Sequence, residues 1–579
     1  MKRFGFSLAW GFATIVLASS LVSAAVVDYT WDVENFTVER LCDEHVVTGV
    51  NGSIPGPAIN VREGDTVIIH VRNKSPYNNS NHYNDICRHG IFQLASQWSD
   101  GPEYVTQCPI PPGGSYRYKF TITKQEGTLW WHAHSSFLRS NVYGALIIRP
   151  RWGHSYPFPR VYQEVPILLG EWWNVNVEDV GNNASQGIVP RNSDAFTING
   201  LPGDLYNCSQ NQTYRLNVKQ GKRYLLRIIN AALNEQHFFK IANHSFTVVA
   251  IDASYTRQYK TDVIVLAPGQ TVDAIITTNQ SVGSYYMAFT EYRSSNVINN
   301  NSTTRGVLVY EGASQSLAPI MPDLPDQFDT PTAHKFYTNI TGLAGGPHWI
   351  PVPRSVDENM FIAFGIALTP CNLPGPSGCI NLGGINVLLS ASMNNESFVL
   401  PKGRGSSMLE ALYHNNVSGV YTRDFPSQPP FVFDYTDPSL AFGNTTLAFA
   451  PKSTKAKPVK FNSTVQIVLQ NTAILGAENH PIHVHGFNFY VLAQGFGNYN
   501  ASVDESEFNF VNLQVRNTIA VPVGGWAVIR FRADNPGIWL VHCHLENHLP
   551  WGLAMTFEVE NGPTPSTRLP SPPADLPKC

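Results

Sequence analysis

Three pairs of histidines, each separated by one residue, are the clearest candidates for chemistry in this chain of 579 residues. They are His132 with His134, His483 with His485, and His542 with His544. Because side chains alternate between the two faces of a β-strand, the members of each pair share a face, whereas Cys543 points the other way. One such pair is weak support for a metal site, since histidines also sit satisfied in cores or bind zinc. Three pairs together favour a metal centre.

A second set of ligands gathers around Cys543. His480 has the opposite parity from His483, so it can turn toward whatever Cys543 faces. With His548, which follows shortly after, these residues make a His₂Cys set. That set is the ligand choice of a blue-copper electron-transfer site, in which the soft thiolate favours copper. The three histidine pairs then belong to a different cluster, to which the segment 86–90 adds His89.

Composition indicates a β-rich protein of several domains. The chain has 44 Gly, 41 Pro, 12% aromatic and only 14% charged residues, which suits many short strands joined by turns. Its length predicts roughly three or four domains. The formal net charge of −4, with no basic block, argues against nucleic acid and against an anionic membrane surface as partners.

The first residues have the pattern of a secretory signal. Lys2 and Arg3 precede an apolar run, and 22–24 offers a small-residue cleavage site, so residues 1–24 are predicted to be removed. An anchoring helix would need a longer apolar run. Sequons for N-glycosylation fit secretion. They include Asn73, Asn183, Asn211, Asn339, Asn395, Asn444 and Asn500.

Most of the eight cysteines should be paired in an oxidising compartment. Cys371 and Cys379 flank a Pro/Gly loop and are expected to pair locally. Two longer bridges can form among Cys42, Cys108, Cys208 and Cys579. Cys543 is reserved as a ligand, which leaves Cys87 over.

An internal repeat predicts three equivalent strands. The segment 63–73 recurs as 220–230 and, more loosely, as 461–471. In each copy apolar residues occupy alternate positions, which predicts a strand with one face toward a core. These residues are Val67, Ile69 and Val71; Tyr224, Leu226 and Ile228; and Val465, Ile467 and Leu469.

A second repeated unit follows each of these strands and places the ligands. It runs from a glycine turn through an alternating strand to a later glycine, and a triplet follows at the same offset after Gly127, Gly283 and Gly537. The triplets are His132–His134, Ala288–Thr290 and His542–His544. The third copy carries ligands on both faces, the first only histidines, and the second neither. Metal is therefore expected in the third domain and between the first and third, with a structural second domain.

Pro- and Gly-rich segments at 149–159 and 318–331 mark the predicted boundaries between domains. We predict a first domain over 25–152 and a second over 153–317. Residues 318–425 are expected to form a long connection packed on the surface, and 426–579 the third domain.

With these motifs assembled, the chain resembles the multicopper oxidases, and within them the laccases of plants. The resemblance covers essentially the whole mature chain. It is carried by the segments Asn51–Pro57, Trp98–Pro102, Gln107–Ile110, Gly127–His134, Asn199–Gly203 and Asp575–Cys579. It implies an all-β fold of three cupredoxin-like Greek-key β-barrel domains.

The resemblance also implies four copper ions: a type 1 copper in the third domain and a cluster of one type 2 and two type 3 coppers between the first and third. The type 1 ligands would be His480, Cys543 and His548. One type 3 copper would be bound by His89, His132 and His544, and the other by His134, His485 and His542. His483 would be a type 2 ligand.

Three further residues gain an interpretation from the same resemblance. Asp100 matches an acidic residue that in laccases helps deliver protons to the cluster, although a turn aspartate in Ser-Asp-Gly is an equal alternative. Leu553 stands where relatives with a weak axial ligand have Met. A hydrocarbon cannot donate to copper, so leucine at this position should raise the reduction potential of the type 1 copper. Met555 has a different spacing and is interpreted as packing. We also expect the bridges Cys108–Cys579 and Cys42–Cys208.

One short segment departs from the pattern. Laccases have His-Trp-His-Gly where this chain has Cys87, Arg88, His89 and Gly90, so Cys87 stands at the position of the second type 2 ligand. The internal repeat agrees, because 86–90 aligns with 482–486. The polar stretch 78–85 is also longer than its counterpart. An error at an exon boundary explains such a patch, and a true substitution is the alternative. His82 could replace the ligand only if its loop folded back.

These observations predict a secreted, extracellular enzyme of the apoplast or cell wall. It would take single electrons from phenols or lignols, reduce dioxygen to water as a monomer, and act in lignin polymerisation or degradation. An exposed imidazole edge of His548 would receive the electron. The alternatives are an ascorbate or metal-ion oxidase, which a carboxylate-rich pocket at the type 1 site would favour, and a cell-wall protein with an impaired trinuclear site.

Overall fold

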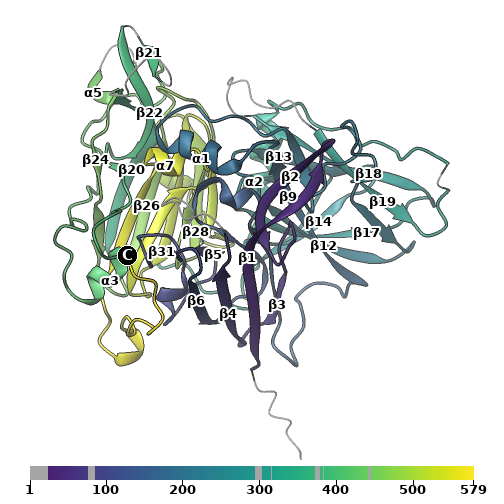
Figure 1. Cartoon of the computed structure of the whole chain (residues 1–579), viewed down its shortest axis with the longest axis horizontal. Coiled ribbons are helices and arrows are strands. Elements are labelled where there is room, and N and C mark those ends of the chain that lie inside the picture. The colour runs from purple at the N-terminus through teal and green to yellow at the C-terminus, as the bar shows by residue number, and fades with distance from the viewer. Residues whose placement is uncertain are drawn as a thin grey trace, which may run out of the picture.

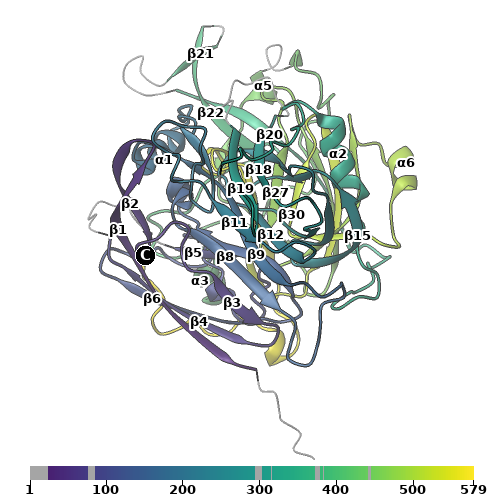
Figure 2. The same cartoon turned by 90° about the vertical axis from the view of Figure 1, so that its right-hand side faces the viewer.

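The computed structural model describes residues 24–75, 85–293, 303–314, 316–371, 379–382, 384–440 and 445–579. Figures 1 and 2 show three domains built from β-sheets, with the first in purple, the second in teal and the third in green and yellow. Hydrogen bonds join every pair of domains: Thr128 with Asp273, Gln97 with Asn535, and Gln270 with Thr518. The all-β fold predicted from composition and resemblance is confirmed.

The first domain packs two four-stranded sheets, with strand orders β2-β1-β4-β6 and β3-β8-β7-β5. The strands are β1 (Val26–Arg40), β2 (Asp43–Val50), β3 (Ile59–Arg62), β4 (Thr66–Asn73), β5 (Ile86–His89), β6 (Ser115–Thr121), β7 (Gly127–Ala133) and β8 (Tyr143–Arg149). Two short 3₁₀ helices follow the ligand-bearing strands, η1 (Gln97–Ser99) and η2 (Ser136–Ser140).

The second domain has a six-stranded sheet, β10-β9-β12-β17-β14-β15, and a five-stranded sheet, β11-β19-β18-β13-β16. The strands are β9 (Gln163–Trp172), β10 (Ala195–Ile198), β11 (Arg215–Val218), β12 (Arg223–Asn230), β13 (Gln236–Ile241), β14 (Phe246–Ile251), β15 (Ser254–Thr261), β16 (Ile264–Leu266), β17 (Thr271–Thr277), β18 (Ser284–Tyr292) and β19 (Thr303–Tyr310). Helix α1 (Val177–Ser185) lies within this domain and α2 (Thr330–Asn339) follows it.

The third domain has a seven-stranded sheet, β21-β22-β20-β26-β31-β28-β29, a five-stranded sheet, β25-β33-β32-β27-β30, and the pair β23-β24. The strands are β20 (Glu358–Pro370), β21 (Ile380–Leu382), β22 (Ile385–Met393), β23 (Ser397–Phe398), β24 (Lys452–Ser453), β25 (Ala456–Val459), β26 (Thr464–Asn471), β27 (His480–Val484), β28 (Phe489–Phe496), β29 (Gln514–Arg516), β30 (Thr518–Val521), β31 (Gly525–Arg532), β32 (Gly537–Cys543) and β33 (Ala554–Val559). The helices are α3 (Met408–Tyr413), α5 (Thr445–Ala448), α6 (Ala501–Asp504), η3 (Glu505–Glu507), α7 (His548–Trp551) and η4 (Pro565–Thr567).

The predicted repeat is confirmed in three dimensions. Strands β4, β12 and β26 each lie between a parallel and an antiparallel neighbour at the same place in their sheets. Their alternating apolar residues belong to the three main hydrophobic cores. The triplet strands β7, β18 and β32 are equivalent too, each flanked by β5 and β8, by β13 and β19, or by β27 and β33.

The structure corrects the prediction of a long surface connection over 318–425. Within that range, β20 pairs in parallel with β26, as β1 pairs with β4 and β9 with β12. Met360, Ile362 and Phe364 are buried in the third core. The strand is mostly apolar on both faces and therefore lacks the alternation on which the prediction depended. We propose that the third domain begins near residue 358.

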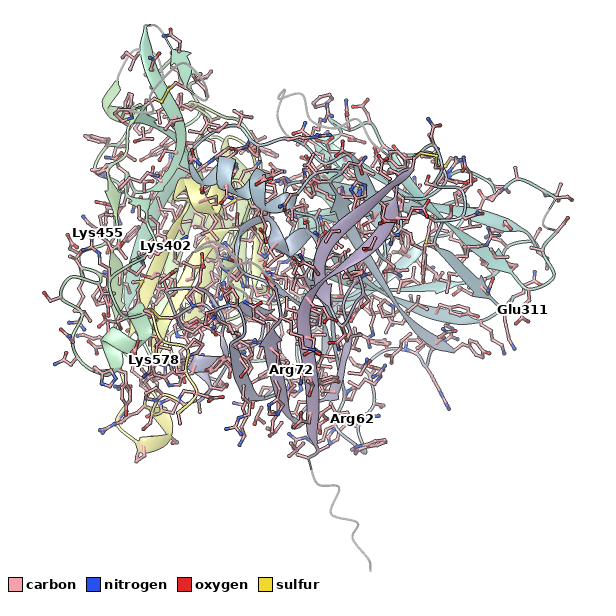
Figure 3. All side chains as sticks on the ribbon, viewed as in Figure 1. Arg62, Arg72, Glu311, Lys402, Lys455 and Lys578 are labelled. Carbon is pink, nitrogen blue, oxygen red and sulfur yellow. A yellow bond between two sulfur atoms is a disulfide. The ribbon has the colours of Figure 1, made fainter. Side chains whose placement is uncertain are left out.

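Charged side chains of both signs are spread over the outside of the three domains, as the six labelled residues in Figure 3 illustrate. The formal net charge of the chain is small, at −4. None of the helices in the described part of the chain combines the length and hydrophobicity needed to cross a bilayer.

All three predicted disulfides are present: Cys42–Cys208, Cys108–Cys579 and Cys371–Cys379. The first joins domains one and two, and the second ties the C-terminus to domain one. Cys87 and Cys543 are the free cysteines of the described chain, and both are buried.

Removing the bridge to the C-terminus should destabilise the fold. Cys108–Cys579 spans a sequence separation of 471 residues, so its loss frees much of the unfolded chain, and we expect a cost of about 2–4 kcal/mol. The measurement is the denaturant midpoint of Cys579→Ser. The matched control is Cys371→Ser, whose bridge spans only 8 residues and should matter less. Equal shifts in the two variants would contradict this ranking.

Candidate metal centre

Two adjacent strands bring the ligands of the third domain together. β27 pairs antiparallel with β32, and His483 lies opposite His542 while Ile482 lies opposite Cys543. Consecutive residues of a strand face opposite sides, so His542 and Cys543 point away from each other, as their parity predicts. Directly opposed residues share a face, so His483 points to the same side as His542. One strand therefore serves two clusters.

The first cluster contains His480, Cys543 and His548, whose candidate ligand atoms converge. The Cys543 Sγ lies 3.5 Å from His480 Nδ1 and 3.4 Å from His548 Nδ1, and the two nitrogens are 3.1 Å apart. His548 Nε2 lies 3.1 Å from Glu478 Oε1, which it can reach as a hydrogen-bond donor, leaving Nδ1 with its lone pair. Burial lowers the pKa of His480 to about 3 and raises that of Cys543.

The expectation of an exposed edge on His548 is wrong. Its side chain is only 4% exposed and Glu478 covers Nε2, while the Glu478 side chain is 31% exposed. The helix α7 begins at His548 and turns its ring inward against Trp551, at a ring-centroid distance of 5.3 Å. A molecule arriving from solvent would therefore meet Glu478 before His548.

The second cluster contains two groups of three buried histidines. The groups are His89, His132 and His544, and His134, His485 and His542. Within them His89 Nδ1 lies 3.1 Å from His544 Nε2, and His485 Nε2 lies 3.3 Å from His542 Nε2. These are the groupings that the resemblance implied; their role as ligands stays a prediction.

Hydrogen bonds fix which nitrogen of several rings faces the cluster. His132 Nδ1 lies 2.7 Å from the carbonyl oxygen of Ala133, and His542 Nδ1 lies 2.9 Å from that of Cys543. His485 Nδ1 lies 3.0 Å from Asp100 Oδ2, so the predicted functional carboxylate does contact the cluster. Each contact leaves Nε2 directed inward. Burial holds the pKa of His132 and His542 well below its usual value, which keeps the rings neutral.

His483 stands beside these two groups. Its Nδ1 lies 2.8 Å from the carbonyl oxygen of Asn517, and its ring stacks on His89 at 3.8 Å between centroids. His89 Nε2 in turn lies 3.1 Å from Asn517 Oδ1 and 3.0 Å from Thr518 Oγ1. The pair Asn517 and Thr518 therefore orients both rings.

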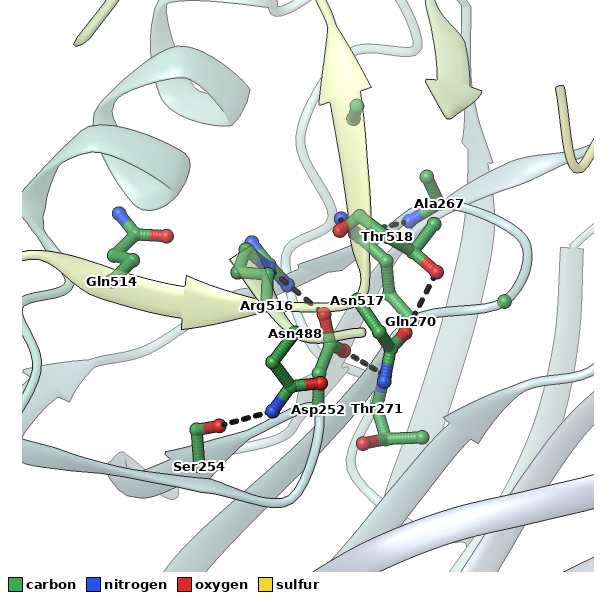
Figure 4. A network of polar contacts seen from close by, with 12 residues as sticks. Asp252, Ser254, Ala267, Gln270, Thr271, Asn488, Gln514, Arg516, Asn517 and Thr518 are labelled. Atoms are coloured by element: carbon green, nitrogen blue, oxygen red, sulfur yellow. Dashed lines mark hydrogen bonds and ion pairs between the residues drawn. The ribbon is translucent and has the colours of Figure 1, made fainter. Parts of the chain in front are cut away.

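Domain two holds this pair in place, although it supplies none of the candidate ligands. Figure 4 shows Arg516 Nε on Asp252 Oδ2, at 3.0 Å, and Gln270 Nε2 donating to the Thr518 carbonyl, at 3.1 Å. Gly269 approaches the rings so closely that an added Cβ would lie 3.0 Å from both His544 and His89, and its φ is +90°. Only glycine suits that position.

Arg139 is a residue of the site that sequence reasoning missed. It is buried, its Nη2 donates to the carbonyl oxygens of His544 and Leu233, at 3.0 and 3.1 Å, and its Nη1 lies 3.2 Å from Glu546 Oε2. It thereby fixes the backbone beside His544. Arg139 lies in η2, outside every motif, and the available signal was the charged Glu546, two residues after the His-Cys-His triplet.

The segment 85–88, which departs from the expected sequence pattern, is buried, and several of its polar atoms have no hydrogen-bond partner in the described chain. Arg88 is inside the first domain with its guanidinium 4.0 Å from the centre of the Tyr118 ring, and its three nitrogens find no hydrogen-bond partner in the described chain. The two carboxylate oxygens of Asp85 likewise have none there. Burial and then Asp100 raise the pKa of the Cys87 thiol. His82, the alternative ligand, lies outside the described residues.

The donor sets fit copper. The Nε2 atoms of His132 and His134 are buried without a hydrogen-bond partner among the described residues, which is costly unless another group binds them. Imidazole suits copper, and the thiolate of the first group favours it over harder ions. Three β-sandwich domains with one His₂Cys group and two neighbouring His₃ groups define a multicopper oxidase.

Comparisons with known proteins agree with the fold and the site. Multicopper oxidase sequence profiles match residues 32–152, 163–313 and 424–563. The chain is 58% identical to Laccase-7 of Arabidopsis thaliana and 51% identical to Laccase-24 of Oryza sativa subsp. japonica, over 98% of each chain. The crystal structure of the laccase from Botrytis aclada matches with a TM-score of 0.71 at 26% identity, covering 96% of this chain and 90% of that one. The chain belongs to the multicopper oxidase family, among the plant laccases.

Proposed function

We propose that this chain is a secreted laccase that oxidises phenols at the His480–Cys543–His548 group and reduces dioxygen at the histidine cluster. The observation that carries the proposal is the backbone link between the two. Cys543 belongs to the first group, and its neighbours His542 and His544 belong one to each His₃ group. Copper, when bound, supplies one-electron oxidation at the first group and four-electron reduction of dioxygen at the second.

The protein's own groups divide the remaining work. Glu478 is partly exposed and touches His548, so it offers a phenol hydroxyl a hydrogen-bond acceptor next to the site of electron loss. Because a phenol that loses an electron becomes a much stronger acid, this carboxylate is placed to take its proton. Asp100 accepts from His485 Nδ1, which supports the ring orientation and places a carboxylate beside the dioxygen site.

A metal-ion oxidase is the second candidate, because a carboxylate next to His548 can also bind a cation. The two functions separate by experiment: rates with a methoxyphenol and with ferrous iron are compared in the parent and in Glu478→Gln. We expect phenol to be the better substrate. Faster oxidation of ferrous iron, lost selectively in Glu478→Gln, would assign the second function instead.

Secretion and copper content are tested directly. The mature N-terminus should be Ala25 if residues 1–24 are removed, which N-terminal sequencing of the extracellular protein checks. Elemental analysis should find four copper ions per chain if each proposed site is filled.

Leu553→Met should lower the reduction potential of copper bound at the His480–Cys543–His548 group. Leu553 is fully buried in the same core as Cys543, and its carbonyl oxygen accepts a hydrogen bond from the Cys543 amide, at 3.0 Å. A thioether there could donate weakly to copper and favour the oxidised ion. Potentiometric titration of the visible absorption measures the change. Met555→Leu is the control, since Met555 lies opposite Val541 rather than Cys543; an equal shift in both variants would count against the axial role of position 553.

A further inference from the structure

The register of the first domain directs Cys87 toward the histidine cluster. β5 pairs antiparallel with β7, and Cys87 lies directly opposite His132. Opposed residues share a face of the sheet, and so do Cys87 and His89, which are two positions apart. Cys87 therefore points to the side on which His89 and His132 present their rings.

The surroundings of Cys87 contain other donors of the kind that metals use. Its Sγ, a carboxylate oxygen of Asp100 and a ring nitrogen of His485 all lie within 4.8 Å of one another, and all three residues are buried. Cys87 is 1% exposed and forms no disulfide with any cysteine of the described chain. The buried Cys87 thiol therefore lies beside the Asp100 carboxylate and the His485 imidazole, and its neighbours are not all hydrophobic.

One histidine of the cluster lacks a complete set of its own. Of the seven buried histidines of this cluster, six form the two His₃ groups, and His483 is left outside them with its Nδ1 2.8 Å from the carbonyl oxygen of Asn517. A third ion beside these groups would need a further donor on the same face. Cys87, which lies close to Asp100 and His485, offers a soft donor on the face of the sheet that carries His89 and His132.

We propose that the thiolate of Cys87, next to Asp100, binds the type 2 copper, which is the third ion of the histidine cluster. The thiolate would take the place of an imidazole ligand. The inference rests on the proposed function. Binding replaces the S–H bond by a copper–sulfur bond and releases the proton to solvent, with no electron transferred. Thiolate softness favours the reduced ion, so the third site holds copper more tightly as Cu(I) than an imidazole site would.

The test uses the full-length chain with the other free thiol removed. Cys543→Ser and Cys543→Ser/Cys87→Ser are loaded with copper, and copper per chain is measured together with X-ray absorption at the copper edge, which detects copper–sulfur scattering in either oxidation state. We expect scattering from sulfur in the single variant and its loss, with one copper fewer, in the double variant. The methionines are the same in both. Cys87→Ser alone should keep the visible absorption of the Cys543 site, which checks the fold.

The possible outcomes distinguish a failure of the Cys87 ligand role from a failure of the proposed function. Copper retained by the Cys543→Ser chain without sulfur scattering would overturn the role of Cys87 and leave the histidine cluster intact. A Cys543→Ser chain that binds no copper at all would overturn the proposed dioxygen site as well.

Discussion

Cys543→Ser is expected to remove the intense visible absorption of the copper-loaded chain and to lower phenol oxidation to background. The thiol lies 3.5 Å from His480 Nδ1 and 3.4 Å from His548 Nδ1, so it completes the group that we propose receives the electrons. A serine hydroxyl at neutral pH is not a soft anionic donor, so thiolate-to-copper charge transfer is lost. The same change should also interrupt the proposed electron route, because Cys543 is the residue that joins the first group to His542 and His544.

Absorption spectra and oxygen uptake measure the two effects. Cys87→Ser is the matched control, since it also removes a buried free thiol but lies in domain one, away from the first group. Its visible absorption should equal that of the parent chain. Absorption that survived Cys543→Ser would show that another residue supplies the thiolate and would overturn the assignment.

Much of the site could be predicted because most of its candidate ligands lie on strands, or directly after them, where side chains alternate with a period of two. His542 and Cys543 diverge, His483 and His542 meet across β27 and β32, and the shared offset after Gly127 and Gly537 predicted equivalent strands. The turn that contains Gly269 belonged to the same repeat. Its role, which is to let domain two lie against His544 and His89, depends on packing between domains and became visible only in the structure.

The missed features depend on contacts between segments far apart in the chain. Arg139 donates a hydrogen bond to the carbonyl oxygen of His544 across a sequence separation of 405 residues. No local sequence pattern predicts this contact. Strand β20 is mostly buried on both faces, so it lacks alternation, and its residues pair with residues of β26 that lie 107 positions later, as Glu358 does with Val465. Glu478 precedes His480 by two residues, but that it covers His548 follows from how α7 turns back.

Restoring the local pattern should accelerate reoxidation of the reduced enzyme by dioxygen. In the double variant Cys87→His/Arg88→Trp, an imidazole replaces the soft thiolate at the third site, so copper there cycles more readily between its oxidation states. Changes to groups that merely support metal ligands alter affinity or activity by about 10–100-fold, and we expect a gain of at least roughly 10-fold from changing the ligand itself. Stopped-flow reoxidation after reduction with a phenol measures it.

The two substitutions should act through different causes. Arg88 buries a guanidinium without hydrogen-bond partners in the described chain, at a cost of several kcal/mol, so Arg88→Trp alone should raise the thermal midpoint and leave the reoxidation rate nearly unchanged. Cys87→His alone should raise the rate. Reduction by phenol should be equal in all variants, because His480, Cys543 and His548 lie in domain three. If the unmodified chain already reoxidises as fast as the double variant, with full copper occupancy, then Cys87 is a fully competent ligand and no defect lies at position 87.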